Sequence, residues 1–313
     1  MKKGILFPTL LLLSMLGGLL HPNSLKPAQA AALTAGKTLV LYDASSGSIP
    51  SETLMDFTDF PPGAASLAYS DGTTVLDSGS SGRDTYAGWV SSQATTADFP
   101  VLDRASGFQL NFTLKLENES HTKNNRSGFS VILLDQEAKG IEISFWENEI
   151  WVQSDDRTGG LFTHGESVPF GTDTGVTAYQ LTIAGDTYTL TGNSQPLLTG
   201  PVRDYGAFEG FPDPYETPNF LFLGDDTTSA RSRVLLSYVS IRGTEPVLPT
   251  VAVTSTSTAI PLPTASVTPP PSATPVPTLT VAPTGKANPL CPSGWLLVLS
   301  VMSCFILARK STR

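Results

Sequence analysis

The chain has 313 residues, with 19 Lys and Arg against 28 Asp and Glu, which gives a formal net charge of −9 at neutral pH. In residues 31–243 alone, 27 acidic side chains outnumber 12 basic ones. Such a surface repels the phosphates of nucleic acids and of anionic lipids, so we expect neither as a partner of this region. Both cysteines, Cys291 and Cys304, lie outside it, which excludes a disulfide framework, a Cys nucleophile and a Cys-based metal site there.

The N-terminus has the three-part pattern of a secretory signal peptide. Lys2 and Lys3 precede an apolar run, and a polar segment then ends in the small residues Ala28 and Ala30. An A-x-A sequence is a typical cleavage site. We therefore predict that residues 1–30 are removed after Ala30 and that the protein is exported, the alternative being a retained membrane anchor.

Residues 31–243 have the pattern of one all-β domain. Their periodic segments alternate with period two, and none keeps a helical stripe for three turns. FQLNFTLKL (108–116) places Phe and Leu on one face and polar side chains on the other, as a strand with one buried face does. AYSDGTTVL (68–76) and YQLTIAGDTYTL (179–190) each place an Asp and a Gly between two such runs, which predicts tight hairpin turns.

Further segments extend this pattern to a two-layered fold. SVILL (130–134), GIEISFW (140–146) and EIWVQ (149–153) are predicted as successive antiparallel strands. VLLSYVSIRG (234–243) is predicted as a closing strand at the edge of the domain. Many short strands with regularly spaced turns favour an antiparallel sandwich.

The order of these segments resembles the concanavalin A-like, laminin-G-like jelly roll. It is similar in particular to the bacterial surface domains called choice-of-anchor domains, which occur with different C-terminal sorting signals. The resemblance covers most of residues 37–243, and GDDTTSA (224–230) is its most distinctive sequence. It implies a module at the cell surface, in the cell envelope, with a jelly-roll fold.

EISFWE, residues 142–147, raises the question of glycosidase chemistry. Glucanases with the jelly-roll fold carry E-x-D-x-x-E on a strand, in which one Glu attacks, the other donates a proton and the Asp tunes both, whereas this chain has Ser144 at the Asp position. Retaining hydrolysis needs two carboxyls about 5 to 5.5 Å apart, but Glu142 and Glu147 point to opposite faces of a regular strand. We therefore expect the domain not to be an enzyme, with a diverged glycan hydrolase as the alternative.

The same strand carries a candidate ligand site. Its outward face holds Glu142, Ser144 and Trp146, where the indole can stack on a sugar ring while the polar neighbours bind hydroxyl groups. The alternative is that a loop covers Trp146, such as the aromatic-rich YGAFEGFPDPY (205–215). The predicted partner is a glycan or a surface protein, and a purely structural envelope protein is a further possibility.

Two acidic and two histidine positions complete the candidates. Asp225 and Asp226 are candidate ligands for calcium, which favours carboxylate and carbonyl oxygens, or else residues of a turn whose side chains bond local amides. No other cofactor is expected. His121 and His164 are the only histidines of residues 31–243, and THGES around His164 has no spacing typical of a zinc site or a triad, so we expect a surface loop there.

The C-terminal segments predict an anchor. Residues 244–289 contain 11 Pro and 11 Thr among 46 positions, a composition that favours a disordered, extended stalk. The largely apolar run 290–308 has 19 residues and extends about 28 Å as a helix, just enough to span a bilayer, and the basic tail 309–313 is then cytoplasmic. Cys291, at the entry to the apolar run, is the candidate position for cleavage by a sorting enzyme, and an unprocessed single-span anchor is the alternative.

Overall fold

The structure is a computed structural model that describes residues 36–79, 85–156 and 160–246. These residues form strands joined by turns and loops, with two short 3-10 helices, η1 (Ala44–Ser46) and η2 (Pro50–Glu52). The predicted signal peptide, most of the predicted stalk and the predicted C-terminal helix lie outside the described residues, as do the two candidate processing positions. Within the described ranges, no helix is long and apolar enough to cross a membrane.

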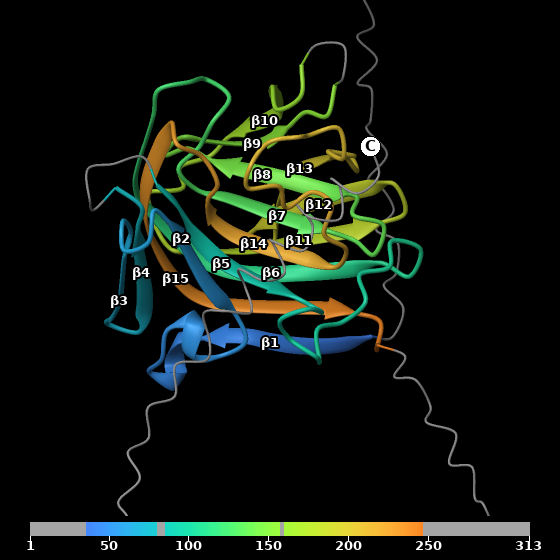
Figure 1. Ribbon diagram of the computed structural model, residues 1–313, viewed down its shortest axis with the longest axis horizontal. Coiled ribbons are helices and arrows are strands. Elements are labelled where there is room, and N and C mark those ends of the chain that lie inside the picture. The colour runs from blue at the N-terminus through green and yellow to red at the C-terminus, as the bar shows by residue number, and fades with distance from the viewer. Residues whose placement is uncertain (1–35, 80–84, 157–159, 247–313) are drawn as a thin grey trace, which may run out of the picture. The chain divides into compact units, whose positions relative to one another are not determined.

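Two antiparallel sheets pack face to face as a sandwich (Figure 1). The eight-stranded sheet consists of β1 (Lys37–Asp43), β3 (Ser66–Ser70), β4 (Thr73–Asp77), β6 (Phe108–His121), β11 (Thr177–Ala184), β12 (Thr187–Gly192), β13 (Gln195–Pro201) and β15 (Ala230–Gly243). The seven-stranded sheet consists of β2 (Asp56–Phe60), β5 (Tyr86–Ser92), β7 (Ser130–Leu134), β8 (Gly140–Phe145), β9 (Glu149–Gln153), β10 (His164–Pro169) and β14 (Phe220–Asp225). The strand orders are β13-β12-β11-β6-β15-β4-β3, with β1 also paired to β15, and β10-β9-β8-β7-β14-β5-β2. The prediction of an all-β antiparallel sandwich is confirmed.

Alternating residues of facing strands supply the core between the sheets. The inward residues of β6 are fully buried, while the intervening ones remain partly exposed. They pack against the inward residues of β7 and β8 in one continuous apolar cluster. These inward residues are Phe108, Leu110, Phe112, Leu114 and Leu116 from β6, Val131 and Leu133 from β7, and Ile141, Ile143 and Phe145 from β8. Burial stabilises the fold by about 1.5–3 kcal/mol per large apolar side chain, so the period-two pattern determines which face turns inward.

Both predicted tight turns are present. Asp71 and Gly72 join β3 to β4 with φ angles of 51° and 75°. Gly185, at φ 57°, and Asp186 join β11 to β12. Glycine and, to a lesser degree, aspartate adopt positive φ at low cost, which is why these pairs close two-residue hairpins.

The predicted edge position of residues 234–243 is wrong. β15 lies inside the eight-stranded sheet, where it pairs with β6 along one side. On its other side it pairs first with β4 and then with β1. Because β15 has 14 residues, two shorter strands share this second side. Alternation reports which face of a strand is buried and contains no information on its neighbours in the sheet.

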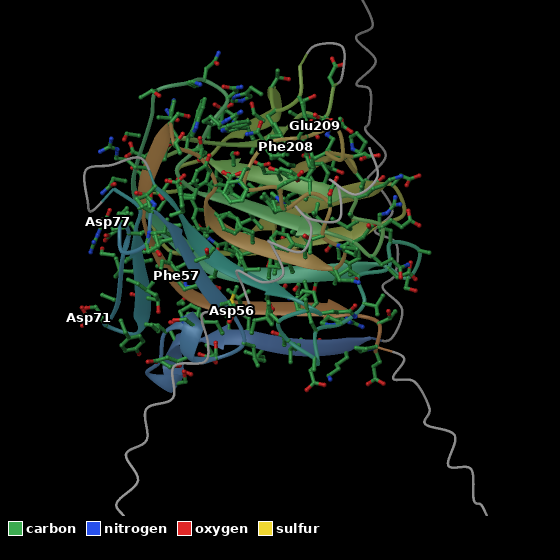
Figure 2. All side chains as sticks on the ribbon, in the orientation of Figure 1. Asp56, Phe57, Asp71, Asp77, Phe208 and Glu209 are labelled. Carbon is green, nitrogen blue, oxygen red and sulfur yellow. The ribbon has the colours of Figure 1, made fainter. Side chains whose placement is uncertain are left out.

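The outer face of the seven-stranded sheet is covered by the segment between β13 and β14, which we call the covering segment (residues 202–219). Tyr205, Phe208 and Tyr215 of this segment pack with Phe162 against outward residues of β7 and β14. Phe208 is labelled in Figure 2. The aromatic-rich loop therefore does cover a sheet, and its apolar contacts are with β7 and β14.

Candidate functional site

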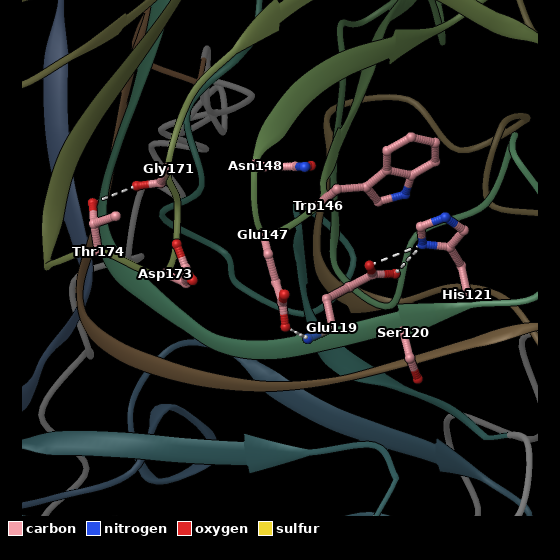
Figure 3. A pocket seen from close by; sticks show the side chains of 9 residues that line it. All are labelled: Glu119, Ser120, His121, Trp146, Glu147, Asn148, Gly171, Asp173 and Thr174. Atoms are coloured by element: carbon pink, nitrogen blue, oxygen red, sulfur yellow. Dashed lines mark hydrogen bonds and ion pairs between the residues drawn. The ribbon is translucent and has the colours of Figure 1, made fainter.

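An open hollow of about 570 Å³ lies where the end of β6 meets the turn between β8 and β9. Figure 3 shows the side chains that line it. Three segments that are far apart in the sequence contribute to it. They supply Glu119, Ser120 and His121 from β6, Trp146, Glu147 and Asn148 from the β8–β9 turn, and Gly171, Asp173 and Thr174 from the connection between β10 and β11.

Two Trp and two His rings pack in a cluster beside this hollow. His121 stacks on Trp146 with ring centroids 4.2 Å apart and an angle of 8° between the planes. His164 stacks on Trp151 with nearly the same geometry, 4.2 Å and 12°. The two indoles meet edge to face at 5.4 Å. Trp151 is fully buried, whereas His121 and Trp146 line the hollow. The buried part of the cluster therefore supports the rings of His121 and Trp146 at a position that a ligand can reach.

Hydrogen bonds hold Trp146 in place directly after β8. Its indole Nε1–H donates to the carbonyl oxygen of Arg126 at 2.9 Å, and its backbone N–H donates to that of Glu149 at 2.9 Å. The Thr172 hydroxyl donates to the Trp146 carbonyl oxygen at 2.7 Å. A ring that is fixed before a ligand arrives loses little conformational entropy on binding.

Carboxylates form much of the remaining wall. Glu119 Oε2 lies 3.0 Å from His121 Nδ1, and Glu119 Oε1 accepts a hydrogen bond from the Gly128 backbone N–H. Burial raises the pKa of Glu119, and the nearby charge of Glu147 adds to this rise, while the hydrogen bond with His121 opposes it. Glu147 Oε1 accepts from the Glu119 backbone N–H at 3.0 Å, and Asp173 is exposed at the rim.

Of the described residues that line the hollow, none is Lys or Arg. Together with its three carboxylic side chains, this charge distribution disfavours anionic ligands and suits neutral or cationic ones.

The three residues predicted to bind ligand occupy two different environments. Trp146 lines the hollow. Glu142 and Ser144 are both buried on the outer face of the seven-stranded sheet, where Ser144 lies opposite Trp151 in the β8–β9 pairing. A ligand in the hollow therefore meets Trp146, while the other two side chains lie inside the fold.

Glu142 belongs to a buried polar network beneath the covering segment. The Tyr215 hydroxyl donates to Glu142 Oε2 at 2.5 Å, and Glu142 also shares a hydrogen bond with Asp226. Burial raises the pKa of Glu142 well above its usual range, and the charge of Asp226 raises it further. The pKa of Asp226 is also raised, mainly by burial. Adjacent desolvated carboxyls disfavour the state in which both are ionised, and thus favour sharing of a proton.

Glu142 and Glu147 have different partners in different parts of the fold. Glu142 contacts Tyr215 and Asp226 on the outer face of the seven-stranded sheet, whereas Glu147 bonds to the backbone of Glu119 in the other sheet. The carboxyl group that neighbours Glu142 is thus Asp226. The E-x-x-x-x-E spacing did not indicate this pair, because the two residues are far apart in the sequence.

The two candidate calcium ligands, Asp225 and Asp226, also have different hydrogen-bond partners. Asp225 is fully buried and accepts hydrogen bonds from Ser78 Oγ at 2.7 Å and from the Thr227 backbone N–H at 3.1 Å. Asp226 instead pairs with Glu142. Within the part of the chain that the structure describes, no group of three or more His, Cys, Asp or Glu side chains is arranged to hold a metal ion. The bond to Thr227 is of the local, turn-forming kind that the sequence offered as the alternative to calcium binding.

The predicted loop position of His164 is wrong, because both histidines lie at strand ends. His121 is the last residue of β6, and His164 is the first residue of β10. His121 stacks on Trp146, whereas His164 stacks on Trp151 and also meets Trp146 edge to face. The spacing of His residues along the sequence does not reveal this, because the four rings meet only when β6, β9 and β10 come together.

No protein-family model matches the chain, and no curated protein matches it either. The resemblance to choice-of-anchor domains therefore stays a prediction.

Solved structures with partial similarity include a carbohydrate esterase from the Shiga toxin-encoding bacteriophage phi24B, with 12% identity over 67% of this chain and 100% of that chain, and a TM-score of 0.45. The exoplasmic/lumenal domain of VIP36 in its Ca2+/Man-bound form has 12% identity over 68% of this chain and 93% of that chain, and a TM-score of 0.39. The binding domain of botulinum neurotoxin DC in complex with rat synaptotagmin II has 10% identity over 67% of this chain and 48% of that chain, and a TM-score of 0.39. Similarities at this level say nothing about the function of the present chain.

Proposed function

We propose that the domain is a non-enzymatic binding module that holds a glycan in the hollow beside His121 and Trp146. The observation that carries this proposal is the combination of a stacked ring pair with hydroxyl, amide and carboxylate side chains around about 570 Å³ of open space. Ring surfaces bury the apolar C–H faces of a sugar, while polar side chains bond its hydroxyl groups. Both kinds of group line this one hollow.

The charge of the hollow narrows the class of glycan. Glu119, Glu147 and Asp173 line it, and its walls contain no Lys or Arg among the described residues. Sugars with carboxylate, sulfate or phosphate groups meet repulsion there. The proposed ligand is therefore a glycan without acidic groups.

We also propose that the module acts outside the cell, at the cell surface or in its envelope. This proposal rests on the sequence of the terminal segments, namely the signal-peptide pattern of residues 1–30, the Pro/Thr-rich stalk and the apolar residues 290–308 followed by a basic tail. Anchoring of the choice-of-anchor kind is consistent with that arrangement. A stalk of this composition holds a binding domain away from the membrane.

A matched pair of histidine variants tests the binding site. His121→Ala and His164→Ala each remove an imidazole stacked 4.2 Å from an indole, but only His121 lines the hollow. The full chain, purified in a detergent without a sugar headgroup, is applied to an array of neutral and acidic glycans. We expect neutral glycans to bind and His121→Ala to weaken them by about tenfold, which corresponds to about 1.4 kcal/mol. His164→Ala, which removes an edge-to-face contact with Trp146 from outside the hollow, should weaken them less. Equal losses in both variants, or no bound glycan, would refute the proposal.

A further inference from the structure

A second hollow, of about 220 Å³, adjoins the first one at the end of β6. It is lined by Ser120, His121, Thr122, Ser229, Ala230 and Arg231. Ser120 and His121 also line the larger hollow. The two hollows therefore adjoin at the end of β6, where Ser120 and His121 line both, and we call the pair the groove.

The two parts of this groove lie on opposite sides of the end of β6. On one side, His121 pairs with Ala230 at the beginning of β15, and Ala230 lines the smaller hollow. On the other side, the Glu147 carboxylate accepts from the backbone of Glu119, and both residues line the larger hollow. Because adjacent strands are about 4.8 Å apart, a ligand that contacts groups on both sides of β6 must extend about 10 Å. This length exceeds that of a single pyranose ring.

Both parts offer groups that bind sugar hydroxyls. In the smaller hollow, the Thr122 hydroxyl donates to the Ser229 carbonyl oxygen at 3.0 Å, and the Ser229 hydroxyl bonds to that of Thr227 at 3.0 Å. A hydroxyl has one donor and two acceptor positions, so each of these groups has capacity for a further partner. Ser120 supplies a third hydroxyl, at the place where the hollows meet.

His121 is oriented for a role between two sugar residues. Its Nδ1 edge faces the Glu119 carboxylate at 3.0 Å, and one face of its ring is covered by Trp146. A ligand in the groove therefore meets the opposite face or the Nε2 edge of the imidazole. A ring held on two sides in this way is a rigid divider between neighbouring subsites.

We infer that the ligand is an extended glycan chain that lies across the end of β6, with one sugar residue in each hollow and His121 between them. This inference rests on the proposed glycan-binding function and adds that recognition requires at least two linked sugars.

The test measures affinity against chain length. Calorimetric titrations of the full chain use two series of neutral β-1,4-linked oligomers, of glucose and of N-acetylglucosamine, from one to six residues. In the series that binds, we expect affinity to rise by about tenfold or more between one and two or three residues and then to level off. This part of the test uses the wild-type chain alone, so it does not depend on the folding of any variant.

A matched pair of threonine variants locates the second subsite. Thr122→Phe fills the smaller hollow, whereas Thr199→Phe changes a threonine on β13 whose hydroxyl also donates to a backbone carbonyl, that of Tyr188, at 2.9 Å. We expect Thr122→Phe to remove the gain in affinity with chain length and Thr199→Phe to retain it.

The outcomes separate the two proposals. If a monosaccharide binds as tightly as the hexamer and His121→Ala still weakens it, the two-subsite inference is wrong and the binding function stands. An unchanged length dependence in Thr122→Phe also overturns the inference. If neither series binds and no neutral glycan of the array binds, both proposals fail.

Discussion

Removing the Tyr215 hydroxyl should loosen the covering segment from the seven-stranded sheet. That hydroxyl donates to Glu142 Oε2 at 2.5 Å, in the buried pair that Glu142 forms with Asp226. Tyr215→Phe deletes a single oxygen atom and keeps the ring that packs against Phe162 and Phe208. The variant therefore isolates the hydrogen bond from the apolar packing.

The expected loss follows from the charge of the acceptor. When the pair shares one proton it carries one negative charge, and a hydrogen bond to a charged group contributes about 1.5–3 kcal/mol to the free energy of unfolding. For a domain of this size, each kcal/mol shifts the melting temperature by about 2–4 °C, so Tyr215→Phe should melt about 3–12 °C below the wild type. Circular dichroism during heating measures the shift.

Tyr69→Phe is the matched control. Its hydroxyl donates to the carbonyl oxygen of Ala44 at 2.7 Å, a neutral acceptor, in a partly buried position. Loss of a neutral hydrogen bond costs about 0.5–1.5 kcal/mol, so this variant should melt closer to the wild type. If Tyr215→Phe melts at the wild-type temperature, or Tyr69→Phe loses more, the assignment of a charged, buried network under the covering segment is wrong.

The same network predicts how stability changes with pH. The pKa of Glu142 is raised in the folded state, so the stabilisation from its proton is complete below the ordinary Glu pKa and is lost as pH rises through the raised value. Glu142→Gln should flatten this decline in the free energy of unfolding, measured by urea unfolding from pH 4 to pH 9. Identical slopes in both proteins would contradict the prediction. Mass spectrometry of the mature protein tests both predicted processing positions. We expect a chain that begins at Ala31 and ends near Cys291, and recovery of an intact tail through Arg313 would exclude sorting.

Local sequence patterns were sufficient to predict much of the sandwich. Period-two alternation identified β6 and the face it buries, because adjacent side chains of a strand point in opposite directions whatever the strand pairs with. The sequence also predicted β7, β8 and β9 as strands, but β7 and β8 are buried on both faces and β9 nearly so. The Asp-Gly and Gly-Asp pairs identified two hairpins, because the φ angles of such turns depend on the turn residues themselves.

The candidate site was visible only in part. Trp146 could be selected because it is aromatic and follows a strand whose outward residues are polar. Its stacking partner His121 could not be predicted, because the contact joins the end of β6 in one sheet to a turn of the other sheet. The pairing of Glu142 with Asp226 was hidden for the same reason.

The sequence by itself thus determined which residues form strands, which faces turn inward and where tight turns close, since each of these depends on neighbours along the chain. Only the tertiary structure decided that β15 lies inside its sheet, that a segment covers Glu142, and that His121 stands at the junction of two hollows. These features depend on how strands distant in the sequence are ordered and packed. A strand can bury its apolar face equally well in several strand orders. Its own alternation therefore does not indicate which strands become its neighbours.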